Sequence, residues 1–419
     1  MTTQATHSAD IRPVVFYDHP LEALRGVAAL LVALGHAIAA GPVFDPHFRP
    51  SGVWQYAPPG HLAVLVFFLL SGYVIGLTNP APLATGEARR RYLRKRIVRL
   101  YPLYILALGA TGILAAAYHK PFSVSEWEGY LVFLQGLAVA VPSYNQPIWS
   151  LPYEMAYYLL FMLVSARAWP AWRVAAGCVG VGVLGTLLHV QPLVLIALAY
   201  GGAFWFTGLA LSTVARRQAP PRYGAMLAWL LLLLAYQRLN LVSAGLHTLG
   251  LDLDENVVPF FERPINFADL SYLLLGVPLL LCFSNRMVPG LLWLERAAFA
   301  SPALYLLAYG LTGRLFGTTN LSVCLPAGAY VVAGVVYLLR GQWAAAAARV
   351  VQRLQPLGSI SYGVYIIHYP LLWLVHEVPF FSGSVGTWLG RLVGYFALVL
   401  GLSWVLERRL QPWLKRRLA

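Results

Sequence analysis

The amino-acid sequence predicts an all-α integral membrane protein, a single bundle of about ten to twelve transmembrane helices with both termini in the cytoplasm. The first observation is composition: 59% of the 419 residues are hydrophobic and 11% are charged, against about 25% charged residues in soluble domains. The second is that apolar runs of about 20 residues, the length that crosses a bilayer, recur along the chain. The third is the formal net charge of +14, which basic cytoplasmic loops explain; no motif predicts nucleic-acid binding.

The two ends of the chain and its cysteines limit the possible domain organisation. Residues 1–20 contain no basic segment followed by a short apolar one, so we expect a cytoplasmic lead and no cleaved signal peptide. Residues 407–419 form a basic tail, also expected in the cytoplasm. The three cysteines lie in apolar runs without paired spacing, so neither disulfides nor a metal site is predicted. Residues 21–406 are then one transmembrane domain.

The first apolar run, residues 21–41, carries Arg25 and His36, which are costly inside a bilayer. Eleven positions of α-helix bring the chain back to within about 20° of its starting direction and raise it by about 16 Å. The two side chains therefore share one face at different depths, and Glu22 lies one turn before Arg25, where the two can pair. This arrangement indicates two parts of one intramembrane site. The alternative is purely structural, with Arg25 at the membrane edge and His36 hydrogen-bonded in the core.

The second run, residues 61–78, follows a loop rich in proline and glycine. Its apolar sequence is interrupted by Ser71, Gly72 and Tyr73. The polar groups could line a site, or the small residues could serve helix packing.

The strongest cluster of positive charge precedes the third helix, which we expect to reach about Tyr118. The positive-inside rule places this cluster in the cytoplasm. Within it Arg96 and Arg99 are three residues apart and so share a helical face, and two guanidinium groups there suit a phosphorylated ligand. The cluster comprises Arg89, Arg90, Arg91, Arg94, Lys95, Arg96 and Arg99.

Next, residues 126–141 are apolar but short. If they do not cross the membrane, the following basic residues stay on the cytoplasmic side, so we predict an interfacial or re-entrant helix. The helix that opens within residues 145–161 contains Glu154, about one turn past Trp149 and Ser150. A carboxylate in an apolar run needs a partner; the alternative is a cap at the helix amino terminus.

The second half of the chain repeats the alternation of spans and charged loops. Residues 240–269 are acidic, unlike the other large loops, and are expected outside. Residues 340–355 are predicted to form an amphipathic helix on the cytoplasmic face. Residues 357–373 hold Ser361 and Tyr362, and then Tyr365 and His368 on one helical face. The remaining spans are expected at about 174–190, 192–213, 223–239, 270–284, 297–316, 321–339 and 386–406.

These motifs, in this order, resemble those of the acyltransferase 3 family, membrane-embedded O-acyltransferases that modify carbohydrates. The resemblance covers nearly the whole chain, and the one departure noted is Glu22, where the family often has Asp. Five stretches carry it: LRGxAALLVxxxH with Arg25 and His36, FFLLSGY with Ser71 and Tyr73, RxxR and LYPxY with Arg96 and Arg99, WSLxxEM with Trp149 and Glu154, and SYxxYxxHxP with Ser361, Tyr362, Tyr365 and His368.

The resemblance implies transfer of a short acyl group, acetyl first, from acyl-CoA to a hydroxyl of an envelope or secreted carbohydrate, in the bacterial inner membrane. Such O-acetylation needs a base for the hydroxyl proton, stabilisation of the oxyanion and exclusion of water. We expect His36 as general base, Glu154 as its orienting partner, and Arg25 at the donor or the developing charge. The resemblance implies no bound cofactor, with acetyl-CoA as a substrate.

The other candidate residues fall into two groups. Donor binding is expected of Arg96, Arg99, Ser71 and Tyr73, whereas the further pocket candidates are Trp149, Tyr153, Ser361, Tyr362 and His368. The rival class is a transporter or flippase, since many spans with intramembrane charges also fit one. Against it, the two halves of the chain show no similarity.

Overall fold

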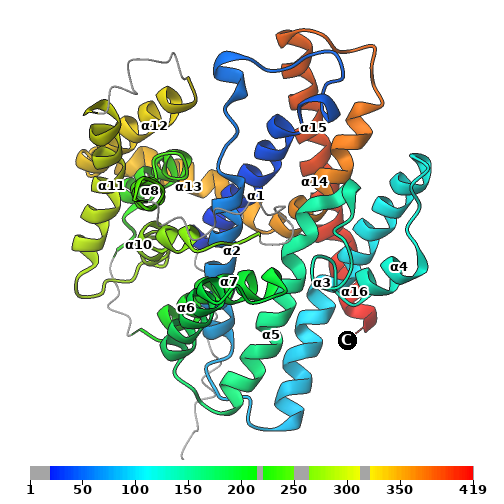
Figure 1. Ribbon diagram of the computed structural model, residues 1–419, viewed down its shortest axis with the longest axis horizontal. Helices are drawn as coiled ribbons and strands as arrows, with labels where there is room; N and C mark the ends of the chain where they lie inside the picture. Colours follow the sequence, from blue (N-terminus) through cyan, green and yellow to red (C-terminus); the bar gives the residue numbers. More distant parts are fainter. Residues whose placement is uncertain (1–18, 215–219, 250–263, 312–320, 419) are drawn as a thin grey trace, which may run out of the picture.

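The computed structural model describes residues 19–214, 220–249, 264–311 and 321–418, and its regular elements within these ranges are helices (Figure 1). The nearest approach to a strand there is one isolated bridge between Gln135 and Val139. The all-helical class is therefore confirmed.

In chain order the elements are α1 His19–Ala39, η1 Gly41–Val43, η2 Gly52–Gln55, α2 Gly60–Thr78, α3 Gly86–Ala117, α4 Val124–Leu131, η3 Ser143–Trp149, α5 Ser150–Ala166, α6 Ala171–Leu187, α7 Leu193–Ser212, α8 Tyr223–Tyr236, α9 Leu241–Thr248, η4 Ala268–Tyr272, α10 Leu273–Phe283, α11 Leu291–Leu311, α12 Leu321–Leu338, α13 Ala344–Gly358, α14 Ser361–His376, α15 Val385–Val405, η5 Leu406–Leu410 and α16 Gln411–Leu418.

Seven helical stretches of the described chain are long and apolar enough to cross a membrane, so this is a multi-pass membrane protein. They contain α1, α2, α3, α7, α8, α11 and α15, while α6, α10 and α12 are apolar but shorter. The count of ten to twelve crossings depends on how these shorter helices sit in the bilayer, and it stays a prediction.

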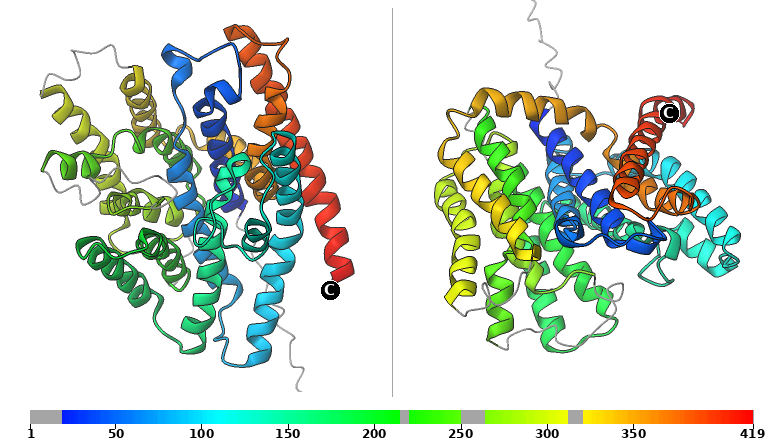
Figure 2. Two further views of the ribbon diagram at one scale, coloured as in Figure 1. Left: turned by 45° about the vertical axis from the view of Figure 1, so that its right-hand side comes forward. Right: turned by 90° about the horizontal axis from the view of Figure 1, so that it is seen from above.

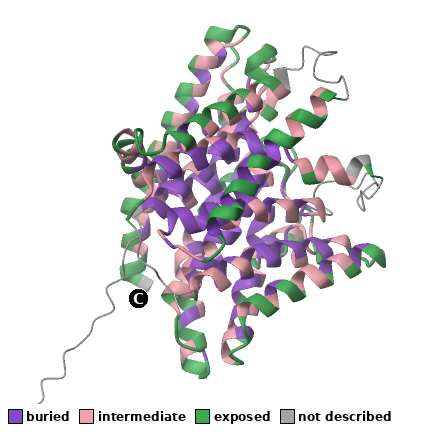
Figure 3. Ribbon diagram, turned by 90° about the vertical axis from the view of Figure 1, so that its left-hand side faces the viewer, coloured by how far each residue is buried: buried purple, intermediate pink, exposed green. Residues whose placement is uncertain are grey.

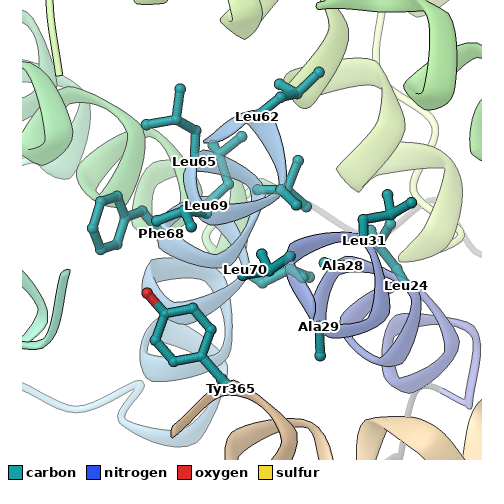
Figure 4. Close-up of a cluster of buried hydrophobic side chains, with 14 of the residues drawn as sticks. Leu24, Ala28, Ala29, Leu31, Leu62, Leu65, Phe68, Leu69, Leu70 and Tyr365 are labelled. Carbon is teal, nitrogen blue, oxygen red and sulfur yellow. The ribbon is translucent and has the colours of Figure 1, made fainter. Parts of the chain in front are cut away.

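The helices that carry the candidate residues lie together near the middle of the molecule. In Figure 1, α1 and α2 lie at the centre, with α14 and α15 on one side and α8, α10, α11 and α12 on the other. Figure 3 shows the buried residues gathered in this central part. Figure 4 shows its apolar packing, with Leu70 of α2 beside Ala28 and Ala29 of α1, and with Tyr365 of α14 close to α2. A site among these helices is therefore enclosed by protein.

Glycines allow α2 and α7 to pack with their backbones in contact. A Cβ atom added to Gly72 would lie 1.8 Å from the carbonyl oxygen of Trp205, and one added to Gly208 would lie 2.0 Å from that of Leu69. Close approach through small residues is what holds helices together in a lipid environment. Gly72 thus interrupts the apolar run of α2 for a packing reason.

We expect Gly72→Ala to destabilise the protein by about 1–3 kcal/mol, because the added methyl group must push α2 away from α7. The matched control is Gly109→Ala on α3, where the added Cβ meets no atom within 4 Å. The measurement is the loss of monodisperse protein on heating in detergent. Equal melting temperatures for the two variants would contradict this account of the interface.

Two segments that were not predicted as spans, residues 126–141 and 240–269, can be compared with the observed helices. The helical part of residues 126–141 is most of α4, an eight-residue helix of about 12 Å, so the prediction that they form no full span is confirmed. The segment expected outside, residues 240–269, begins with helix α9, and residues 250–263 lie outside the described part; the external location stays a prediction. Asp269 at its end is 5% exposed and lies 3.0 Å from the imidazole of His61, so this carboxylate is buried against α2.

The carboxyl-terminal tail is not separate from the bundle. α15 passes through the π-helical segment η5 directly into α16, and Figure 2 shows them as one long helix that ends at the carboxyl terminus. The predicted boundary between residues 406 and 407 therefore falls inside a continuous helix. The predicted amphipathic helix at residues 340–355 is present as α13.

Candidate functional site

A cavity of about 790 Å³ runs along one face of α2, from Val64 to Thr78. This stretch of helix is about 21 Å long. α1, α3, α5 and α14 supply the other walls. The residues that line it are Leu21, Glu22, Arg25, Val64, Phe67, Phe68, Leu70, Ser71, Val74, Ile75, Leu77, Thr78, Pro80, Lys95, Arg96, Arg99, Leu100, Ser150, Leu151, Glu154, Tyr158, Ser361, Tyr362 and Tyr365.

One end of the cavity is strongly basic. Arg25 of α1 enters the wall there and pairs with Glu22 at 2.9 Å. Lys95, Arg96 and Arg99 of α3 join it. Because Arg96 and Arg99 are three residues apart, α3 presents both on the same face, as their spacing predicts. Among the residues that line this end, the cationic side chains outnumber the carboxylate of Glu22, so this end suits an anionic ligand.

Halfway along the cavity, Glu154 of α5 faces Ser71 of α2. The hydroxyl of Ser71 donates a hydrogen bond to the carboxyl group of Glu154 and accepts one from the indole nitrogen of Trp205 at 3.2 Å. Tyr158, one turn further along α5, lines the cavity next to Glu154. The partner that an intramembrane carboxylate needs is therefore a hydroxyl on a neighbouring helix.

The other end of the cavity is closed by Tyr365 of α14. Its hydroxyl donates to the carbonyl oxygen of Pro147 at 2.6 Å and lies 2.6 Å from the hydroxyl of Ser150. Since the tyrosine has one proton and gives it to Pro147, Ser150 must be the donor in the second contact. The ring of Phe67 packs edge-on against Tyr365, with 5.9 Å between ring centroids.

Just past this closure, His36 of α1 and His368 of α14 form a hydrogen-bonded pair. Nδ1 of His36 lies 3.1 Å from Nε2 of His368, and the rings stack at 5.1 Å. His368 is fully buried, whereas His36 is half-buried. Tyr369 packs edge-on against His36 at 5.5 Å. The side chain that is accessible to a substrate is therefore His36.

The surroundings of His368 determine the tautomer of both neutral rings, that is, which ring nitrogen carries the proton. Nδ1 of His368 faces the carbonyl oxygens of Tyr365 at 2.8 Å and Val364 at 3.1 Å, so it must carry the proton. Nε2 of His368 is then an acceptor, and Nδ1 of His36 must be its donor. By the same logic, Nε2 of His36 carries the lone pair, which is the form that a general base requires.

A buried arginine connects the loop after α1 to the end of α14. Arg391 of α15 is 4% exposed. It donates to the carbonyl oxygens of Phe44 at 2.9 Å and Val375 at 2.8 Å, and it lies 3.7 Å from Asp45. The loop after α1 is thereby tied to the end of α14, next to the histidines. Arg391 is not among the residues predicted from the sequence, although a single charge inside the last apolar run is a signal for a buried functional group.

The structure separates the predicted residues into those that line the cavity and those that do not. The lining set is Arg25, Ser71, Arg96, Arg99, Glu154, Ser361 and Tyr362, and the set outside is His36, Tyr73, Trp149, Tyr153 and His368.

Tyr73, Trp149 and Tyr153 are packing residues in this structure. Tyr73 is fully buried, and the guanidinium of Arg286 lies 5.0 Å from its ring centroid. Trp149 and Tyr153 pack edge-on against each other at 5.4 Å. The expected orienting partner of His36 was Glu154, but the structure gives His36 the imidazole of His368 and Glu154 the hydroxyl of Ser71.

Comparison with known proteins identifies relatives of the chain. Acyltransferase MdmB of Streptomyces mycarofaciens is 30% identical over 151 residues, which cover 34% of this chain and 38% of that protein. ORF330 of Acidianus two-tailed virus, named as a candidate acetyltransferase, is 30% identical over 149 residues, or 35% of this chain and 41% of that protein. Protein 2 in the picA locus of Rhizobium radiobacter is 37% identical over 99 residues, or 23% and 44%. The aligned region thus spans less than half the length of each relative, and no solved structure matches the chain.

The family itself is shown by a longer match. A family model described as an acyltransferase domain, that of acyltransferase 3, matches residues 18–294. This region includes α1, α2, α3 and α5, which supply the basic end of the cavity, Glu154 and His36. The protein therefore belongs to the acyltransferase 3 family.

Proposed function

We propose that the protein transfers a short acyl group, acetyl first, from acyl-CoA to a hydroxyl group of an envelope or secreted carbohydrate, in the bacterial inner membrane. The observation that carries the proposal is the histidine pair. His368 orients His36 so that its Nε2 can accept a proton, and the pair lies just past the closed end of a cavity whose other end is basic. Membership of an acyltransferase family supports the same activity.

The basic end of the cavity is the proposed site for the phosphates of coenzyme A. Guanidinium groups bind phosphate oxygens through charge-assisted, paired hydrogen bonds. Nε of Arg96 is buried without a hydrogen-bond partner among the described residues, and a bound phosphate would supply the missing acceptor. The positive-inside rule supports a cytoplasmic location for this end, where acyl-CoA is present. The apolar wall of α2 would then take the thioester arm.

At the other end, we propose that His36 acts on the acceptor. Nε2 of His36 takes the proton of the acceptor hydroxyl as its oxygen attacks the thioester carbonyl. The carbon–sulfur bond breaks, an ester forms, and coenzyme A leaves as a thiolate that takes up a proton from water at the basic end, while His36 gives its proton to water on the acceptor side and returns to the neutral form. His368 holds the tautomer of His36 and steadies the ring while it is charged. The thioester must reach past the contact between Ser150 and Tyr365, so this closure opens when the donor is bound.

The ring of Phe67 at the closed end would limit the length of the acyl chain. We expect Phe67→Ala to raise the preference for butyryl-CoA over acetyl-CoA, measured as the ratio of kcat/KM values, by about 15-fold, since two further buried methylene groups contribute about 1.6 kcal/mol. Val74→Ala, in the same wall but two turns nearer the basic end, is the control and should leave the ratio unchanged. An unchanged ratio in Phe67→Ala would place the acyl group elsewhere.

The first experiment is acyl transfer from radiolabelled acetyl-CoA in membranes, with wild type and His36→Ala at matched expression. Label in a glycan fraction with wild type, and its loss with the variant, are the expected results. Equal labelling would make His36 a packing residue. If wild type labels nothing with any short acyl-CoA, while export of a glycan depends on the protein, the transporter or flippase class replaces the enzyme.

A further inference from the structure

The helix that carries the arginine pair contains a proline where its backbone needs a donor. Pro102 lies inside α3, one turn after Val98. In a regular helix the N–H of residue 102 would bind the carbonyl oxygen of residue 98, but proline has no N–H, and its ring crowds that carbonyl group. In a membrane protein such a freed carbonyl must find another partner.

The partner comes from the carboxyl-terminal helix. Nε2 of Gln411, the first residue of α16, lies 3.0 Å from the carbonyl oxygen of Val98 and 2.8 Å from that of Arg99. The amide group has two N–H donors, so it can give one to each oxygen. Gln411 is 2% exposed. Because a buried donor or acceptor without a partner is destabilising, these hydrogen bonds stabilise both the amide group and the two carbonyl groups. Gln411 thus replaces the hydrogen bond that Pro102 removes.

A second side chain of the same segment ties it to α14. Glu407 in the π-helical segment η5, four residues before Gln411, accepts a hydrogen bond from the backbone N–H of Gly363 at 3.1 Å. This N–H belongs to the first turn of α14, where the helix itself provides no acceptor. Tyr362 next to it donates to the carbonyl oxygen of Leu100 at 2.9 Å. The backbone of α3 around Arg99 is therefore held by two side chains, one from α16 and one from α14.

We infer that Gln411 is a positioning residue for the donor site: it completes the backbone of α3 at Pro102 and so fixes the direction in which Arg96 and Arg99 enter the cavity. The inference deepens the proposed function and rests on it. It gives the carboxyl-terminal segment a role beyond its positive charge, because residues 407 and 411 connect the arginine helix to the helix that carries Tyr365 and His368.

The test is a steady-state analysis of Gln411→Ala with acetyl-CoA as the varied substrate. We expect KM for acetyl-CoA to rise about tenfold, since the Val98 carbonyl group is left without a donor and the Arg99 carbonyl group loses the contact with Gln411, while kcat stays within about twofold. Gln411→Glu keeps the shape but, as a carboxylate, has no N–H to donate, so it should behave like the alanine variant. Gln352→Ala, an exposed glutamine of α13, is the matched control and should equal wild type.

A double variant distinguishes positioning from general packing. Pro102→Ala restores the backbone N–H that binds Val98, so in its background Gln411→Ala should raise KM by less than about threefold and should cost less thermal stability than in wild type. If Gln411→Ala raised KM and lowered thermal stability equally in the wild-type and Pro102→Ala backgrounds, the proposed link between Gln411 and Pro102 would be wrong. If Pro102→Ala reduces the stability cost of Gln411→Ala but Gln411→Ala leaves KM unchanged, the hydrogen bonds stand and only the positioning role is overturned. A wild type without any acyl transfer would remove the proposed function and this role together, and the stability cycle would still report on the hydrogen bonds.

Discussion

Replacement of His36 by alanine should lower the rate of acyl transfer about 1,000-fold, within the range of about 10²–10⁴ that a general base contributes, and should leave KM for acetyl-CoA within a few-fold of wild type. The reason is geometric: His36 belongs to the histidine pair and not to the wall of the cavity that would bind the donor. The measurement is the release of coenzyme A thiol by purified protein with an accepted carbohydrate. His47→Ala, an exposed histidine in the loop after α1, is the control.

Variants of His368 test whether it acts through His36. His368→Ala removes the acceptor for Nδ1 of His36 and should lower kcat strongly. His368→Gln, whose side-chain carbonyl can accept the same N–H, should keep more of the rate. If the two variants were equally impaired while thermal stability was unchanged, the tautomer argument would be wrong. If His36→Ala retained the wild-type rate, the base would have to be another group.

The second large effect is expected at the basic end of the cavity. Arg96→Ala and Arg99→Ala should each raise KM for acetyl-CoA about 10- to 100-fold, because a hydrogen bond to a charged group contributes about 1.5–3 kcal/mol, and kcat should change much less. Arg96→Lys and Arg99→Lys should lie between these variants and wild type, since lysine keeps the charge but not the planar pair of donors. A higher salt concentration should also raise the wild-type KM for acetyl-CoA, because it screens the attraction between the arginines and the phosphates.

The control for this prediction lies in the same basic segment. Arg90 is exposed near the amino terminus of α3 and does not line the cavity. Arg90→Ala removes the same charge from the membrane surface without touching the proposed site, so it should leave KM near the wild-type value. A similar rise in KM for Arg90→Ala would mean that the segment acts through its total charge and not through two placed side chains.

The local part of the site could be predicted because it follows from helical periodicity. Arg25 with Glu22, and Arg96 with Arg99, share faces on single helices, and the structure keeps both pairs at one end of one cavity. Periodicity also explains one miss. Ser71 lines the cavity, whereas Tyr73, two positions later, lies about 200° around the helix and is buried under Arg286. A motif in the sequence marks both residues equally.

The long-range part could not be predicted from the same patterns. His36 and His368 are 332 positions apart, and nothing in either local sequence indicates that α1 and α14 are neighbours. The role of Gln411 depends on a carbonyl group that a proline 309 positions earlier leaves without a donor, which is a property of the packed backbone. Both sets of contacts arise from tertiary structure, and a single sequence carries no direct signal for them.

The contact between Ser150 and Tyr365 has an electrical consequence. This contact is a short barrier between the basic cavity and the imidazole pair. In an energised membrane much of the voltage would fall across it. On the proposed route the thioester reaches through the opened contact, so the thiolate forms beside His36 and carries its negative charge back across this barrier as coenzyme A leaves. Separation of one elementary charge across 100 mV changes its free energy by about 2.3 kcal/mol. The rate of acyl transfer in sealed vesicles would then respond to an imposed membrane potential.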